Sequence, residues 1–177
     1  MGQYREIVAQ SAAEPRSDTD PCVGCGMCCD GTMYSMGKAE PGEESRIAAH
    51  GLSLIEHDGQ RYFSMPCRHS CEGRCAIYEE RFAKCRSYKC KLLKEYQLGG
   101  TSPEAAHEIV QTALELRSDA LAAHPDAGLS TDRTRLRSEF GRSKDHRDLV
   151  LRMAALDYYL DVHFRNKELQ VTPEQRA

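Results

Sequence analysis

Four cysteines fall within eight residues near the start of this 177-residue chain, in the sequence Cys22-Val23-Gly24-Cys25-Gly26-Met27-Cys28-Cys29. Glycine accepts positive φ angles, so the two glycines allow the loop to curl and to turn successive sulfur atoms toward one point. Metal coordination needs such convergence, whereas ordinary core packing does not. The spacing therefore predicts a metal-binding loop at this place in the chain.

Five further cysteines follow, at Cys67, Cys71, Cys75, Cys85 and Cys90. We expect them to meet the first loop around metal, which makes all nine cysteines candidate ligands. An odd number of cysteines cannot pair completely into disulfides. The density and spacing of the nine also disfavour the alternative that they are merely buried thiols.

Two kinds of centre fit these ligands. Zinc takes four thiolates in a tetrahedron, typically as two closely spaced pairs, and Cys22 with Cys25 makes one such pair. The run Cys22-x2-Cys25-x2-Cys28 also matches the first three ligands of a bacterial-type [4Fe–4S] site, with the fourth from a distant thiol. The spacing favours the iron–sulfur cluster slightly, and both cofactors stay open. Adjacent Cys28 and Cys29 point differently, which leaves room for a second centre.

Other side chains near the later cysteines have two interpretations each. His69 is either an imidazole ligand or an exposed loop histidine, and Met33 and Met36 are soft ligands or, as we favour, gap-filling core residues. The local cations either form a solvated helix face or offset the charge of a thiolate–metal centre. These cations are Arg74, Arg81, Lys84, Arg86, Lys89, Lys91 and Lys94.

The helix and strand signals around these residues predict an α+β fold. We expect it to be mainly helical, with a small cysteine-rich, metal-centred core. Residues 1–20 are expected to form a flexible arm, and residues 21–177 a single domain. Pro41, acidic residues after it and Gly51 predict a short helix, and Asp58-Gly59 predicts a hairpin joining strands 52–56 and 60–65. The hairpin would return Cys67 to the first loop.

Helical periodicity begins after Cys75 and stops at Gly99-Gly100, which predicts one helix from Tyr78 to Tyr96. On a continuous helix, Cys90 would be rotated by roughly 140° from Cys85. Cys90 is therefore the weakest candidate for sharing a site with Cys85, unless the helix breaks between them. The cysteine-rich part therefore covers residues 21–98.

A helical part, residues 101–170, completes the predicted domain. One helix should begin at Ser102-Pro103-Glu104 and end at His124-Pro125, and another should cover about 143–169, with residues 126–142 irregular between them. These helices are expected to brace the cysteine-rich half. Their apolar positions are Ala106, Ile109, Val110, Ala113, Leu116 and Leu121 in the first, and Leu149, Val150, Met153, Leu156, Leu160 and Phe164 in the second.

The cysteine pattern resembles the CxxCxxCC family, described as zinc- or iron-chelating, YkgJ-like cysteine-cluster proteins. The resemblance covers roughly residues 21–90 and implies that seven cysteines are metal ligands: Cys22, Cys25, Cys28, Cys29, Cys67, Cys75 and Cys85. Tyr78 and Arg81 match the family's Cys-x-Ile-Tyr-x2-Arg signature. Members usually have a proline near that arginine, which is absent here, and Cys71 and Cys90 are additional to the usual set.

Composition limits the function further. A net charge of −3 does not indicate general nucleic-acid binding, and no apolar run approaches the ~20 residues that cross a membrane. The first twenty residues lack the apolar segment of a secretory signal, so the chain is predicted to be cytoplasmic, where thiols stay reduced.

Three classes of function remain open. The first is a metal-binding protein with a structural, metal-handling or electron-transfer role. The second is an iron–sulfur-dependent transferase, because flagellin lysine methylases have a similar cysteine domain. The chain offers neither a Gly-rich nucleotide loop nor a recognisable catalytic set, so we favour a role without catalysis. The third is a metal-stabilised interaction module that binds a protein partner through the C-terminal helices.

Overall fold

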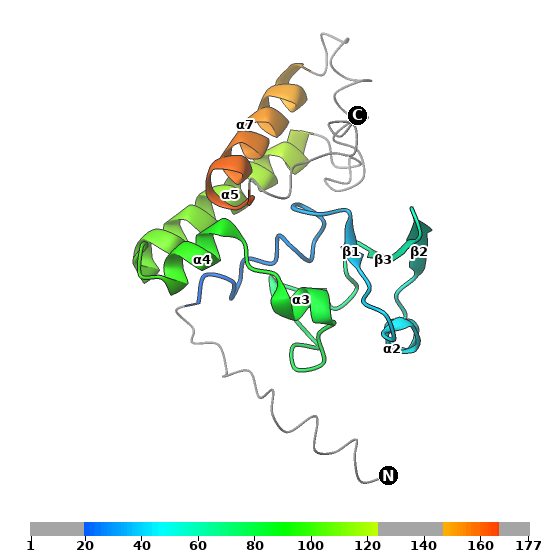
Figure 1. Cartoon of the computed structure of the whole chain (residues 1–177). Coiled ribbons are helices and arrows are strands. Elements are labelled where there is room, and N and C mark those ends of the chain that lie inside the picture. The colour runs from blue at the N-terminus through cyan, green and yellow to red at the C-terminus, as the bar shows by residue number, and fades with distance from the viewer. Residues whose placement is uncertain (1–19, 124–146, 167–177) are drawn as a thin grey trace, which may run out of the picture.

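The computed structural model describes residues 20–123 and 147–166, which form an α+β fold (Figure 1). The described helices are α2 (Glu44–Ala49), α3 (Ala83–Ser87), α4 (Lys91–Gln97), α5 (Pro103–Ala123) and α7 (Arg147–His163). The described strands are β1 (Met36–Lys38), β2 (Leu54–His57), β3 (Gln60–Ser64), β4 (Ser70–Cys71) and β5 (Arg74–Cys75). Helices outweigh strands, so the predicted class, α+β and mainly helical, is confirmed.

The predicted hairpin is confirmed as β2 and β3, with bounds that differ by up to two residues. His57 pairs with Gln60, and the two residues between them, Asp58 and Gly59, have φ angles of 51° and 67°. Positive φ at both turn positions matches the right-handed twist of a hairpin, which explains the preference for Asp-Gly. The sequence did not predict β1, which pairs antiparallel with β3 and makes a three-stranded sheet of order β1-β3-β2.

The prediction of one helix from Tyr78 to Tyr96 is wrong. Helix α3 ends at Ser87, and Tyr88 is extended, with ψ of 130°. Cys90 is also extended, and its Sγ accepts a hydrogen bond of 3.4 Å from the amide of Leu93, so it caps the start of α4. The chain therefore changes direction between Cys85 and Cys90, and their separation along an ideal helix does not apply.

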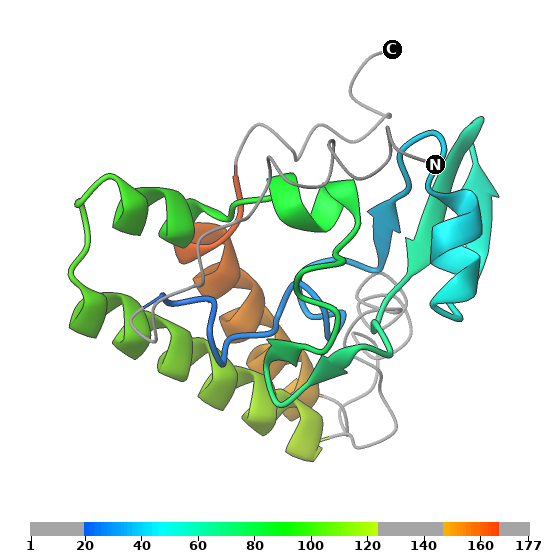
Figure 2. The same ribbon diagram turned by 90° about the horizontal axis from the view of Figure 1, so that it is seen from below.

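The short helix predicted after Pro41 is present as α2, and Gly51 follows it with φ of 68°. Short strands β4 and β5, which the sequence did not predict, form a second hairpin in which Ser70 pairs with Cys75. The turn of this hairpin, at Gly73, lies against Gly24 and Gly26 of the cysteine loop. In Figure 2 the loop, drawn in blue, runs between the helices on the left and the sheet on the right.

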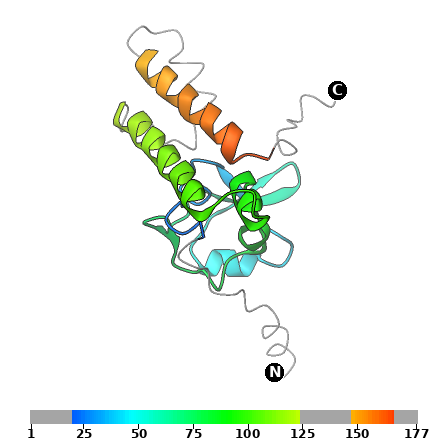
Figure 3. The ribbon, with the colours of Figure 1, turned by 90° about the vertical axis from the view of Figure 1, so that its left-hand side faces the viewer.

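Helices α5 and α7 are antiparallel and lie side by side, extending away from the cysteine-rich part (Figure 3). Small residues on α5, such as Ala106 and Ala113, are buried and allow close approach. On α7, Leu156 and Leu160 are fully buried, as the periodicity predicts. Several predicted features lie outside the described residues. They are the helix ends at 124–125, 143–146 and 167–169, the irregular segment 126–142 and residues 1–19 of the expected arm.

The C-terminal end of α7 is tied to α4 by backbone and side-chain hydrogen bonds. The Lys91 amide donates to the Phe164 carbonyl at 2.9 Å. The Asn166 amide group donates to the Lys89 carbonyl at 3.1 Å, and Lys94 Nζ donates to Asn166 Oδ1 at 2.9 Å. These contacts attach the long helices to the segment that contains Cys90, as expected of a brace.

Two separate hydrophobic cores result. The helical core joins the cysteine loop to α4, α5 and α7, and its buried residues are Met27, Met33, Cys90, Leu92, Leu93, Ala106, Val110, Ala113, Ala120, Leu149, Met153, Leu156, Leu160 and Phe164. The sheet core lies between α2, the three-stranded sheet and α3, and its buried residues are Ala39, Ile47, Leu52, Phe63, Met65 and Phe82. Within the described residues, no helix is long and apolar enough to cross a membrane.

Candidate metal centre

The cysteine loop is built from tight turns. Asp20 Oδ1 accepts the Cys22 amide at 2.8 Å, and the Gly26 carbonyl accepts the Cys29 amide at 2.8 Å. Gly24 and Gly26 have φ angles of 85° and 64°, as predicted from their position between the cysteines. The loop therefore curls at the two glycines, and all nine cysteines of the chain are free thiols.

The loop is packed against the β4–β5 hairpin with no room for a side chain at Gly26 or Gly73. A Cβ at Gly73 would lie 2.3 Å from the Gly24 carbonyl oxygen, and one at Gly26 would lie 2.7 Å from the Gly73 Cα. Gly73 also has φ of 72°. Backbone therefore touches backbone here, which fixes the distance between the first loop and the hairpin that contains Cys71 and Cys75.

Three loop cysteines lie on the helical core together with Cys90. Cys90 is 9% exposed and belongs to that core, and the other three are partly buried against it. We call this set the Cys90 group; its members are Cys22, Cys25, Cys28 and Cys90.

The fourth loop cysteine lies with the remaining thiols. The Cys29 carbonyl accepts the Cys67 amide at 2.7 Å, which confirms that the hairpin returns Cys67 to the first loop. Cys67 and Cys85 pack against the sheet core, and Cys75 lies on β5 opposite Ser70. We call this set the Cys85 group; its members are Cys29, Cys67, Cys75 and Cys85.

Burial is the largest cause of the raised pKa values among the thiols, and the charges of neighbouring thiols add to it. Burial raises the pKa of Cys25 to about 12, and negative charge on Cys22 and Cys90 raises it further. Burial also raises the pKa of Cys28 well above its usual value, and the charges of Cys25, Cys90, Cys29 and Cys22 raise it further. The charge effect on Cys28 therefore reaches across to Cys29 of the other group. Burial and the charges of neighbouring thiols therefore favour the protonated forms of Cys25 and Cys28.

Two members of the Cys85 group, Cys29 and Cys85, show the same effect. Burial raises the pKa of Cys29 to about 12, followed by the charges of Cys85, Cys75 and Cys67. Burial raises the pKa of Cys85 to about 11, again with contributions from Cys67 and Cys75. The positive charge of Arg81 acts in the opposite direction and lowers the pKa of Cys85. A bound metal would have to displace protons from these thiols, which makes binding pH-dependent.

The sulfur atoms do not form a coordination sphere. Within residues 20–123 and 147–166, no three His, Cys, Asp or Glu side chains lie close enough together to hold a metal ion. The donor chemistry of each group, four thiols, nevertheless fits zinc or a [4Fe–4S] cluster. The structure thus brings eight of the predicted ligands into two neighbourhoods, and coordination would require each neighbourhood to contract.

The ninth cysteine stands apart. Cys71 is exposed on β4 and belongs to neither group. His69, the other candidate on this loop, has its Nε2 2.9 Å from the His50 carbonyl, so that nitrogen already has a partner. Met33 is buried in the helical core, which confirms its expected packing role, and Met36 is partly buried on β1.

Most of the predicted cations are surface groups. Arg74, Arg86, Lys89 and Lys94 are exposed, in keeping with a solvated face. Arg81 differs because its Nε donates to the Tyr78 carbonyl at 2.8 Å and its guanidinium lies 3.6 Å from the centre of the Tyr78 ring. The two residues of the signature motif thus hold each other, with the cation near Cys85.

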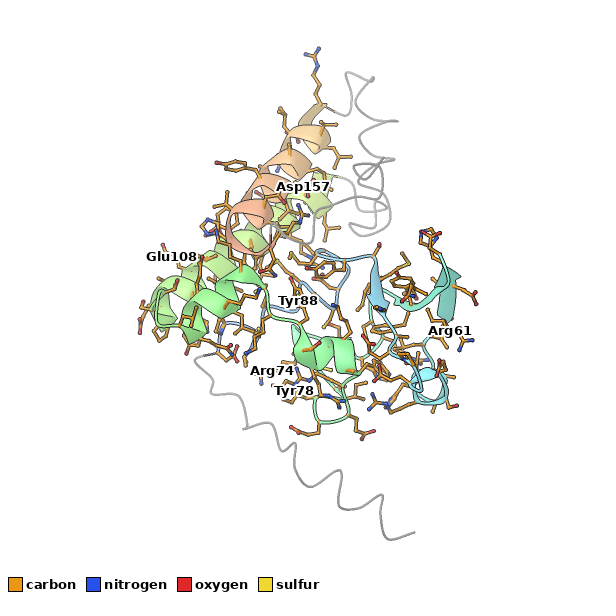
Figure 4. The ribbon with its side chains drawn as sticks, viewed as in Figure 1. Arg61, Arg74, Tyr78, Tyr88, Glu108 and Asp157 are labelled. Atoms are coloured by element: carbon orange, nitrogen blue, oxygen red, sulfur yellow. The ribbon has the colours of Figure 1, made fainter. Side chains whose placement is uncertain are left out.

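Sequence reasoning did not find two contacts that position the loop. Arg117 of α5 donates from Nε to the buried Thr32 hydroxyl at 3.0 Å and lies 3.1 Å from Asp30 Oδ2. Tyr34 and Tyr88 are hydrogen-bonded through their hydroxyls and pack edge to face. Figure 4 shows Tyr88 between the helical side and α3, where the chain passes from one group to the other. No local sequence pattern predicts either contact, because each joins residues more than fifty positions apart.

Comparison of the chain with protein-family models, with curated proteins and with solved structures gives no match. The resemblance to the CxxCxxCC family therefore rests on the cysteine spacing and the Tyr78 and Arg81 signature alone.

Proposed function

We propose that this chain is a metal-binding protein that holds zinc or iron–sulfur through its cysteine cluster. The observation that supports the proposal is that eight free thiols, from three separate stretches of sequence, fall into two neighbourhoods on either side of the Cys28–Cys29 peptide bond. Thiols collected only for packing would have no reason to meet one another, since free cysteine behaves as an ordinary small apolar residue in a core.

The position of the thiols favours a structural contribution to the role. They lie where the helical core, the sheet core and the β4–β5 hairpin meet, and metal-binding energy at such a junction is also folding energy. Metal handling and electron transfer use the same ligands and remain alternatives within this proposal. None of them requires a catalytic residue.

The test is the metal content of protein purified without oxygen. We expect bound metal: either a brown solution that absorbs near ~400 nm and contains iron and sulfide, or a colourless one that contains zinc. The Cys25→Ser variant should lose metal, whereas the matched Cys71→Ser variant should retain it, because Cys71 is exposed and outside both groups. A stable wild-type protein with neither metal, or equal metal in both variants, would overturn the proposal.

A further inference from the structure

We infer that the chain builds two separate metal sites of four thiols each, one from the Cys90 group and one from the Cys85 group. This inference rests on the proposed function and deepens it: it fixes the number of centres and assigns each ligand. Cys71 takes part in neither.

The division begins at the Cys28–Cys29 peptide bond. Cys28 packs against the helical core with Cys22, Cys25 and Cys90, whereas the backbone of Cys29 is hydrogen-bonded to Cys67. Cys67 and Cys85 face the sheet core, which shares no buried residue with the helical core. Two neighbouring ligands are thus directed to different hydrophobic environments.

The numbers of thiols support two centres rather than one. A structural zinc site and a [4Fe–4S] cluster each take four thiolates. A single centre would leave four partly or fully buried thiols with no metal, whereas two centres use all eight. The one cysteine that would then be left over is also the exposed one.

Cys90 has a special position in this assignment. The sequence places it with the later cysteines, but the break after α3 turns it back to the loop. Its Sγ already accepts the Leu93 amide, a type of hydrogen bond that also tunes metal-bound thiolates. Cys90 therefore supplies to its site the ligand that the Cys22-x2-Cys25-x2-Cys28 run lacks.

The chain passes between the two sites at two points. One is the Cys28–Cys29 bond, and the other is the segment from Cys85 to Cys90, whose Tyr88 is bonded to Tyr34 of the loop connection. The assignment therefore gives two neighbouring sites with separate ligands and without a bridging sulfur. That distinguishes the arrangement from one multinuclear thiolate cluster.

The wild-type protein provides the first test, in which the metal-free chain is loaded with cadmium and studied by cadmium NMR. We expect two metal ions per chain and two resonances typical of four-sulfur coordination, without coupling between the two cadmium nuclei. If the native cofactor is iron–sulfur, analysis should give ~8 irons per chain, four for each cluster. A single resonance, or cadmium–cadmium coupling through a shared sulfur, would overturn the inference even though metal is bound.

Variants then assign the ligands. Cys90→Ser should lose one resonance and Cys85→Ser the other, while Cys71→Ser should keep both. Loss of the same resonance in Cys90→Ser and Cys85→Ser, or of either in Cys71→Ser, would contradict the assignment. If a variant fails to fold, the wild-type stoichiometry and coupling still decide between one centre and two. Failure of the wild type to bind any metal would instead reject the proposed function itself.

Discussion

The helical core and the sheet core differ in how much apolar packing supports the thiols beside them. The helical core buries fourteen residues from the loop, α4, α5 and α7, and the two long helices supply most of its aliphatic side chains. The sheet core buries six, around Phe63 and Phe82, and draws on strands of five residues or fewer. Small cores usually need disulfides or metals to be stable. We therefore expect metal binding by the thiols to contribute more to folding on the side of the sheet core than on the side of the helical core.

Metal removal should give the largest difference between the two sides. With chelator and reductant present, residues 36–87 should lose most of their amide protection, because a structural metal contributes about 10–16 kcal/mol in small zinc domains. The buried faces of α5 and α7 should stay better protected, because the aliphatic side chains of the two helices supply most of their packing and the four thiols of the Cys90 group add little to it. Hydrogen exchange followed by mass spectrometry, with and without metal, measures both. An equal loss of amide protection in both cores would show that the sheet core does not depend on metal more than the helical core does.

The contact between the cysteine loop and the β4–β5 hairpin should be next in sensitivity. Gly73→Ala forces a Cβ to within 2.3 Å of the Gly24 carbonyl oxygen, and overpacking of this kind costs typically ~1–3 kcal/mol beyond the strain at positive φ. Gly59→Ala is the matched control: its φ of 67° is similar, and nothing lies within 4 Å of the added Cβ. Urea unfolding should therefore show a clearly larger loss for Gly73→Ala. Similar losses would mean that the hairpin does not fix the loop.

These local features could be predicted because their causes are local. Gly24 and Gly26 turn the loop at positive φ, Asp58-Gly59 sets the hairpin, and the apolar stripes of α5 and α7 follow from helical period. Each depends on residues within a few positions of one another. The α+β class, the β2–β3 hairpin and the two long helices could therefore be predicted from the sequence.

The allocation of the thiols could not be predicted in the same way. The apolar period from Tyr78 to Tyr96 indicates one helix, but Tyr88 is held extended beside Tyr34, and Cys90 caps α4 with its own thiol. The Tyr34–Tyr88 contact joins residues 54 positions apart and depends on the tertiary structure, whereas the Cys90 cap is a local contact that the apolar period does not reveal. Strand β1 could not be predicted for a similar reason, because its three residues pair with the distant strand β3, with Met36 opposite Ser64.

Arg117 provides a smaller test, because it ties the helical side to the loop beside Cys29. Its hydrogen bond to buried Thr32 and its ion pair with Asp30 are partly shielded from water, so Arg117→Ala should cost about 1–3 kcal/mol of unfolding free energy. Arg152→Ala is a suitable control, since that residue forms an exposed pair with Asp148 one turn away on α7 and should change little. Thermal or urea unfolding of the two variants measures the difference. An equal effect would show that the link from α5 to the loop is dispensable.

Arg81 gives the smallest expected effect and the one most confined to the sheet side. Its positive charge lowers the pKa of Cys85 against the larger effect of burial, which raises that pKa to about 11. Without the charge, the thiol pKa rises further, protons compete better with metal, and binding at neutral pH weakens.

Loss of the contact with the Tyr78 ring should cost only ~0.5–1 kcal/mol of stability in Arg81→Ala. The metal affinity of the Cys85 group should fall by about tenfold, the low end of the range for residues that support a metal ligand. Chelator competition on the wild type, Arg81→Ala, Arg81→Lys and Arg86→Ala measures this directly.

Arg86, next to Cys85 in sequence but exposed, serves as the control, and Arg86→Ala should match the wild type. Arg81→Lys should recover part of the affinity, because the ammonium restores the charge but not the planar stack on Tyr78. An equal affinity loss at both groups would show that Arg81 acts on the fold as a whole rather than on Cys85.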